Sequence, residues 1–162
     1  MKKQPCRIFV VEDHPATARG LKAFLELAGY VVTTAGDMRS ALQIANDSAF
    51  DVLVCDLNLP DGTGWQLMEQ LRAKSPLRGI AFSAFDEPEH VARSKAAGFD
   101  EHVVKGTTPE ALLAAIDRVA SFRLPVDGAA ATPTDNVAIR NGATKKRRAA
   151  RPRKASTTTS RA

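Results

Sequence analysis

Short apolar runs alternate with segments of helical periodicity from Arg7 to about Phe122, and this alternation constrains the fold more than any other feature. The runs are three to five residues long, and several are apolar at consecutive positions, as expected of strands covered on both faces. They occupy residues 8–11, 30–34, 52–55, 79–82 and 102–104. Strands that alternate with helices favour βα units and a parallel sheet.

The segments between the runs predict five helices, over residues 15–28, 38–48, 64–74, 87–97 and 109–122. Pro15 begins the first of them and Gly29 ends it, and Thr108 is the predicted cap of the last. The helix over 87–97 offers only Val91 and several alanines to a core. We therefore expect it to be loosely held and open to a partner.

Charge divides the chain into two unlike parts. Residues 1–122 carry 13 basic and 16 acidic side chains, a net charge of −3, whereas residues 123–162 carry ten basic and two acidic ones, a net charge of +8. The second part is rich in Ala, Thr, Pro, Arg and Lys and has no apolar period, which predicts disorder. We expect one folded domain over residues 6–122 and a basic disordered tail over 123–162, without a second folded output domain.

The sequence contains neither a membrane span nor a disulfide framework. No apolar run approaches the roughly 20 residues that cross a bilayer, and residues 1–5 lack the apolar core of a secretion signal. Two cysteines, Cys6 and Cys55, are too few for a framework, and we expect both to be reduced. These features predict a cytoplasmic protein with no membrane partner.

Polar residues follow four of the predicted strands at the point where each strand ends. Glu12 and Asp13 follow the first strand, Asp56 the third, Ser83 the fourth and Lys105 the fifth. The carboxyl ends of parallel strands share one edge of the sheet, and ligands bind there. These five side chains are therefore expected to converge on one crevice.

This mixture of side chains suits phosphoryl transfer. Three crowded carboxylates repel one another unless a cation joins them, and an all-oxygen cluster suits Mg²⁺. A hydroxyl and an ammonium group supply donors and positive charge to a phosphoryl group in transfer. A carboxylate can then act as the nucleophile, and Asp56 is the best placed of the three.

In this order the motifs resemble the receiver domain of two-component response regulators, over about residues 6–122. They are Val11-Glu12-Asp13, the run from Cys55 to Gly62, Ser83-Ala84, and Lys105. The resemblance implies a flavodoxin-like, doubly wound sheet of five parallel strands in the order 2-1-3-4-5. It also implies a signalling switch and not a turnover enzyme.

The resemblance further implies a role for each site residue. Asp56 would accept a phosphoryl group from a sensor histidine kinase or a histidine phosphotransfer protein. Mg²⁺ would be bound by Asp13, Asp56 and the backbone carbonyl of Asn58, with Glu12 reaching it directly or through water. Ser83 and Lys105 would contact the phosphoryl oxygens.

Switching would follow from an inward movement of Ser83, accompanied by rotation of the residue three positions before the lysine, which is His102. The face formed by the fourth helix, fifth strand and fifth helix would then bind a different downstream protein. A homodimer formed on phosphorylation is left open.

One position departs from the receiver pattern. Receivers usually carry a proline with a cis peptide bond after the lysine, whereas this chain has Gly106. A cis bond before a residue other than proline costs about 2.5–4 kcal/mol. We expect the Lys105 loop to be trans and more mobile; the sequence does not determine how this affects the rates of phosphorylation and dephosphorylation.

Two other functions are compatible with parts of the sequence. A phosphatase of the haloacid dehalogenase type also uses an aspartate nucleophile, but it needs a second aspartate where this chain has Asn58. Alternatively, the protein is a phosphorylation-independent adaptor or a nucleic-acid-binding protein that acts through its basic tail, where the runs 145–148 and 151–154 could neutralise phosphates.

Overall fold

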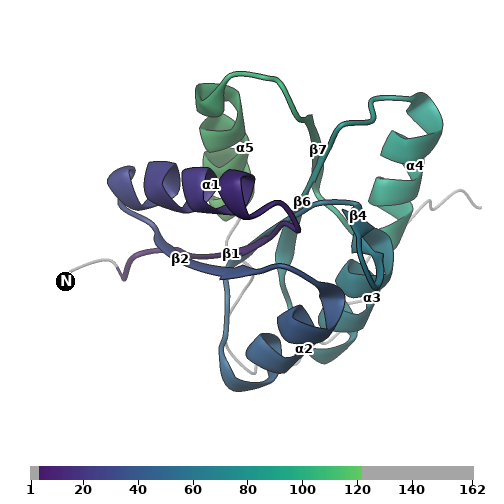
Figure 1. The fold of residues 1–162 in the computed structure, drawn as a ribbon, viewed down its shortest axis with the longest axis horizontal. Coiled ribbons are helices and arrows are strands. Elements are labelled where there is room, and N and C mark those ends of the chain that lie inside the picture. Colours follow the sequence, from purple (N-terminus) through teal and green to yellow (C-terminus); the bar gives the residue numbers. More distant parts are fainter. Residues whose placement is uncertain (1–3, 122–162) are drawn as a thin grey trace, which may run out of the picture. The chain divides into compact units, whose positions relative to one another are not determined.

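The computed structural model describes residues 4–121, which contain a five-stranded parallel sheet (Figure 1). Its strands lie in the order β2-β1-β3-β6-β7, which is 2-1-3-4-5 when these five are counted along the chain. Their bounds are Arg7–Val11 for β1, Val31–Ala35 for β2, Val52–Cys55 for β3, Arg78–Ser83 for β6 and Glu101–Val104 for β7. The predicted doubly wound, flavodoxin-like architecture is confirmed.

Five helices pack on the two faces of this sheet (Figure 1). Helices α1 and α5 cover one face, and α2, α3 and α4 cover the other. Their bounds are Pro15–Leu27 for α1, Met38–Asp47 for α2, Gly64–Lys74 for α3, Pro88–Ala97 for α4 and Pro109–Ser121 for α5. Proline begins α1, α4 and α5, and the Thr108 hydroxyl caps α5 by accepting from the N–H of Ala111 at 3.3 Å.

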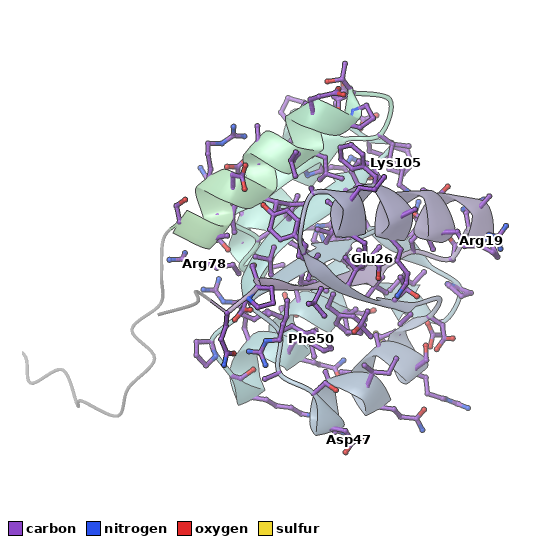
Figure 2. The ribbon with its side chains drawn as sticks, turned by 90° about the vertical axis from the view of Figure 1, so that its left-hand side faces the viewer. Arg19, Glu26, Asp47, Phe50, Arg78 and Lys105 are labelled. Carbon is purple, nitrogen blue, oxygen red and sulfur yellow. The ribbon has the colours of Figure 1, made fainter. Side chains whose placement is uncertain are left out.

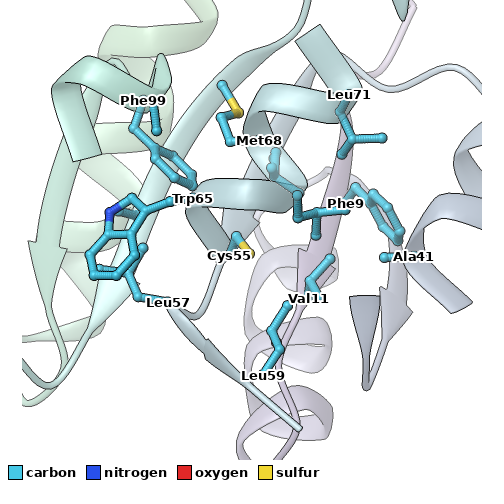
Figure 3. Packing of buried hydrophobic residues seen from close by; sticks show 14 of the residues in the cluster. Phe9, Val11, Ala41, Cys55, Leu57, Leu59, Trp65, Met68, Leu71 and Phe99 are labelled. Carbon is cyan, nitrogen blue, oxygen red and sulfur yellow. The ribbon is translucent and has the colours of Figure 1, made fainter. Parts of the chain in front are cut away.

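Alternate residues of β1 build two cores, one on each side of the sheet. Phe9 and Val11 point into the core below α2 and α3, where Met68 and Leu71 of α3 meet them (Figure 3). Ile8 and Val10 point to the opposite core, under α1 and α5. A strand that is buried on both faces has a continuous apolar sequence, and for this reason β1 could be predicted from the sequence.

Charged side chains are exposed on the outer surfaces of α1 and α2, among them Arg19 on α1 and Asp47 at the end of α2 (Figure 2). Between residues 4 and 121, no helix combines the length and apolar character that a bilayer span requires. The predicted basic tail over 123–162 lies outside the described residues.

A short hairpin that the sequence did not predict separates β3 from α3. Its strands are β4 (Asn58–Leu59) and β5 (Gly62–Thr63), and Asp61 lies in the turn between them. The Asp61 carboxylate accepts from the backbone N–H groups of Met38 at 2.7 Å and Arg39 at 2.8 Å. These bonds lower the pKa of Asp61 and join the hairpin to the first turn of α2.

Helix α4 buries little apolar surface. Its buried residues are Ser94 and Ala97, while Val91 is 38% exposed, so the expectation that Val91 faces the core is wrong. The helix has the weak apolar stripe that the sequence predicts, and polar and aromatic contacts attach it to α3.

Candidate functional site

Side chains from three strand ends meet at the carboxyl edge of the sheet. The Lys105 ammonium, after β7, lies 2.7 Å from Oε2 of Glu12 and 2.6 Å from Oδ2 of Asp56. Glu12 follows β1 and Asp56 follows β3, so Lys105 joins two carboxylates from strands that are neighbours in the sheet. The predicted convergence of these three residues is present in the structure.

Backbone hydrogen bonds hold each of these residues in place beyond the regular ladder. The N–H of Glu12 donates to the carbonyl of Ala35 at 3.0 Å, and the N–H of Asp56 donates to that of Val11 at 2.8 Å. The N–H of Lys105 donates to the carbonyl of Ser83 at 2.7 Å. These bonds join the ends of neighbouring strands around the three side chains.

Burial and the neighbouring carboxylates act in opposite directions on the pKa of Lys105. Glu12 is 2% exposed and Asp56 is 7% exposed. Burial alone would lower the pKa of Lys105, but its hydrogen bonds and charge contacts with Asp56 and Glu12 outweigh burial and raise it. Lys105 is therefore cationic at neutral pH and offsets part of the negative charge beside it.

The start of α3 packs closely on the peptide that carries Asp56. The N–H of Gly64 donates to the carbonyl of Leu57 at 2.9 Å, and a Cβ added at Gly64 would lie 2.3 Å from the carbonyl oxygen of Asp56. The Asp56 side chain accepts at Oδ1 from the N–H of Asn58, at 3.1 Å. Only glycine permits this approach of helix and strand.

An acidic cluster beside the lysine offers ligands to a metal ion. Three potential ligand atoms lie within 4.8 Å of one another, one each from Glu12, Asp13 and His14. Within this cluster, Oδ1 of Asp13 is 3.0 Å from Nδ1 of His14. The two carboxylates, one buried and one partly exposed, fit the oxygen ligands and retained waters of Mg²⁺. Asp56 is outside this group of three.

The two residues expected to switch, Ser83 and His102, meet at one residue of the loop between β6 and α4. Ser83 is 1% exposed, and its Oγ accepts from the N–H of Phe85 at 3.2 Å. Nε2 of His102 lies 2.7 Å from the carbonyl oxygen of Phe85. Phe85 thus contacts both side chains through its backbone.

The Lys105 loop is trans, as the glycine after the lysine predicted. Residues 4–121 contain no cis peptide bond, and Gly106 has φ = 98°, in the left-handed region that favours glycine. The N–H of Thr107 donates to the carbonyl of Val104 at 3.2 Å and closes the turn.

Sequence reasoning missed the contact between Trp65 and Ser94. Nε1 of Trp65 donates to Oγ of Ser94 at 3.0 Å, and this Oγ lies 3.1 Å from Nδ1 of His102. The available signal was the spacing of His90, Ser94 and Ala97, which places a serine on the inner stripe of α4.

Comparison with known families and curated proteins gives a consistent result. A family model described as the response regulator receiver domain matches residues 8–117. The probable transcriptional regulatory protein TcrX of Mycobacterium tuberculosis is 36% identical over 103 residues, which are 63% of this chain and 44% of that protein. The nitrate/nitrite response regulator protein NarP of Escherichia coli is 35% identical over 115 residues, 69% of this chain and 54% of NarP. The chain therefore spans about half the length of these curated relatives.

Solved structures show the same architecture. The chemotaxis protein CheY4 of Vibrio cholerae has a TM-score of 0.68 and 31% identity, covering 71% of this chain and 98% of that one. The non-phosphorylated HemR receiver domain of Leptospira biflexa has a TM-score of 0.70 and 31% identity, covering 74% of this chain and 98% of that one.

Proposed function

The chain belongs to the response regulator receiver family, and from this premise we propose that it is a phosphorylation switch in a two-component pathway. Asp56 is the proposed phosphoacceptor. The observation that carries the proposal is the placement of the Lys105 ammonium 2.6 Å from the Asp56 carboxylate, with the buried Glu12 on its other side.

The proposed reaction is a displacement at phosphorus. A carboxylate oxygen of Asp56 forms the new O–P bond, and the bond between phosphorus and the donor group breaks, with its electron pair leaving on the donor. Lys105 and the hydroxyl of Ser83 contact the phosphoryl oxygens and offset their negative charge. The product is an acyl phosphate, so the domain changes state once per phosphoryl group and is not a turnover enzyme.

Mg²⁺ is the proposed cofactor. Asp13 and Glu12 would hold it together with Asp56 and the backbone carbonyl of Asn58, and their oxygens match the ligands that this ion prefers. A bound Mg²⁺ would supply positive charge to the transferring phosphoryl group.

The proposed donor is a sensor histidine kinase or a histidine phosphotransfer protein, and the output is altered binding of a downstream protein in the cytoplasm. Two curated relatives are described as a transcriptional regulatory protein and a nitrate/nitrite response regulator. The receiver domain is proposed to occupy residues 6–122 and the basic tail 123–162. The alternative outputs are contact between that tail and nucleic acid and formation of a phosphorylation-dependent homodimer.

The test is direct phosphorylation of the full chain. The protein is incubated with Mg²⁺ and acetyl phosphate, and intact mass is measured with and without a chelator. We expect one added phosphoryl group, which is absent in Asp56→Asn and present in the control Asp47→Asn, whose side chain is exposed at the end of α2. An unchanged mass in the wild-type protein, or an equal gain in Asp56→Asn, would refute the proposal. The first of these outcomes would favour the phosphorylation-independent adaptor.

A further inference from the structure

A chain of polar side chains crosses from α3 through α4 to β7. Nε1 of Trp65 is 3.0 Å from Oγ of Ser94, Oγ of Ser94 is 3.1 Å from Nδ1 of His102, and Nε2 of His102 is 2.7 Å from the carbonyl oxygen of Phe85. Trp65 and Ser94 are 6% and 1% exposed. Three elements are therefore connected through a hydroxyl that water does not reach.

When the imidazole of His102 is neutral, the direction of every hydrogen bond in this series follows from the groups at its two ends. The indole of Trp65 can only donate, and the carbonyl of Phe85 can only accept. His102 must therefore carry its proton on Nε2, which leaves Nδ1 as an acceptor. Ser94 then accepts from Trp65 and donates to Nδ1 of His102, so every polar atom in the chain has a partner.

Ring contacts reinforce the same connection on the surface side of α4. His90 stacks on Trp65 with ring centroids 5.8 Å apart and on Phe85 with centroids 5.1 Å apart. The guanidinium carbon of Arg93 lies 3.9 Å from the centroid of Trp65. Since α4 buries little apolar surface, these ring contacts and the Ser94 hydroxyl contribute to its attachment. Figure 3 shows Trp65 at the α3 end of this connection, beside Phe99 and Leu57.

This series of hydrogen bonds reaches the proposed phosphorylation site through the backbone of Phe85. Its carbonyl accepts from His102, while its N–H donates to Oγ of Ser83 at 3.2 Å. Movement of Ser83 toward a phosphoryl group on Asp56 would take this acceptor away from Phe85. The loop after β6 is thus held at one residue by both Ser83 and His102.

We propose that Ser94 is a positioning residue that, together with Trp65, fixes the ring of His102 and thereby holds the loop between β6 and α4 in its unphosphorylated arrangement. The inference rests on the proposed function, because it concerns the regulation of the same site. In this proposal, the series of hydrogen bonds that begins at Trp65 on α3 stabilises the unphosphorylated state of the switch.

The consequence is a shift in the population of the two states. A single buried hydrogen bond contributes an amount of free energy that corresponds to roughly two- to tenfold in an equilibrium constant. Removing the Ser94 hydroxyl leaves Nδ1 of His102 and Nε1 of Trp65 without these partners in the resting state. The phosphorylation-competent arrangement then becomes more populated.

The experiment compares Ser94→Ala with Trp65→Phe, which removes the indole donor and keeps an aromatic ring, and with Ser40→Ala as the matched control. Ser40 is also a helical serine whose hydroxyl bonds within the fold, at 3.1 Å to the carbonyl of Asp37, but it lies on α2. Two quantities are measured for each full-length protein: the rate of phosphorylation by acetyl phosphate with Mg²⁺, and the imidazole ¹⁵N spectrum of the unphosphorylated form.

We expect Ser94→Ala to be phosphorylated roughly two- to tenfold faster than the wild-type protein, Trp65→Phe to change in the same direction by less, and Ser40→Ala to remain unchanged. We also expect Nδ1 of His102 to change resonance position in Ser94→Ala, which a merely structural role for the serine would not produce. Equal phosphorylation rates in Ser94→Ala and the wild-type protein, or an unmoved Nδ1 resonance, would overturn the proposal.

The two readouts separate this proposal from the function on which it rests. If the wild-type protein is not phosphorylated at all, the proposed function fails. The spectrum of the unphosphorylated protein still shows whether Ser94 positions His102, since that measurement needs no phosphodonor. If phosphorylation occurs normally but neither readout responds to Ser94→Ala, only the positioning role is refuted.

Discussion

Replacing Gly64 with alanine tests whether the start of α3 must approach the Asp56 peptide as closely as the structure shows. An alanine Cβ would lie 2.3 Å from the carbonyl oxygen of Asp56 and 3.0 Å from Cα of Leu57. Both neighbours are backbone atoms at the end of a buried strand, so neither can move aside as a flexible side chain would. Gly64→Ala must therefore displace either the helix or the strand end.

The magnitude follows from the size of that displacement. Ordinary van der Waals contact of such a Cβ begins at 3.4 Å, so the two backbones must separate by about 1 Å. Overpacking of this kind costs about 1–3 kcal/mol of unfolding free energy. The helical preference of alanine over glycine offsets only a small part of this cost, because Gly64 is the first residue of α3.

Gly20 provides a matched control within the same chain. It lies within α1, is exposed, and an added Cβ would meet nothing within 4 Å. Gly20→Ala should therefore stabilise the protein by about 0.5–1 kcal/mol, through helical preference alone.

Urea unfolding of both variants measures the two effects with opposite expected signs. Gly64→Ala should shift the midpoint to lower urea and Gly20→Ala to higher urea, with slopes close to that of the wild-type protein. Because the Asp56 peptide is the one displaced, Gly64→Ala should also be phosphorylated more slowly. A Gly64→Ala protein as stable as Gly20→Ala would show that the close approach of α3 to β3 is not a constraint.

Three further predictions concern other parts of the fold. Burial, followed by the charges of Asp56 and Glu12, raises the pKa of the Cys55 thiol, so iodoacetamide should modify Cys55 only after unfolding, as peptide mapping would show. Tyr30→Phe removes the hydroxyl bond to Asp117 on α5 and should lower the unfolding free energy by about 1 kcal/mol in urea titrations, whereas no loss would discount that bond. The N–H groups of Met38 and Arg39 lower the pKa of the Asp61 carboxyl. The stabilisation that the ionised carboxylate provides is therefore present above pH 3.8, the ordinary pKa of this group, and is lost as the pH falls further. The difference in Tm between wild type and Asp61→Ala should therefore disappear in acid.

Most of the sheet could be predicted because its strands are buried on both faces. A strand such as Val52–Cys55, with all four residues buried, is an apolar run whichever face is considered. The hairpin between β3 and α3 was missed because strands of two residues have no periodicity to detect. Its contact with α2 through Asp61 depends on tertiary approach, which no local pattern in the sequence contains.

The site was predictable for the residues at strand ends and not for those that reach it through another helix. The position of Lys105 after its strand was enough to place it beside the Asp56 carboxylate, because parallel strands end at a common edge. The contact of Trp65 with Ser94 joins residues 29 positions apart on two helices, and only their packing brings them together. Val91 was misassigned for the same reason, since apolar character alone does not say which side of a weak helix faces inward.

The formal charges of the side chains around Lys105 bear directly on the proposed chemistry. Three carboxyl side chains, those of Glu12, Asp13 and Asp56, lie near a single ammonium, that of Lys105, which contacts the first and the last of them. The formal charges of the four groups sum to −2, and a phosphodonor would bring further negative charge toward Asp56. Lys105 alone cannot offset that repulsion, whereas one divalent cation would neutralise the four groups. Phosphorylation of this domain should therefore depend steeply on a divalent ion, and Asp13→Asn, which removes one charge from the exposed side of the cluster, should weaken Mg²⁺ binding without displacing Lys105 from Asp56.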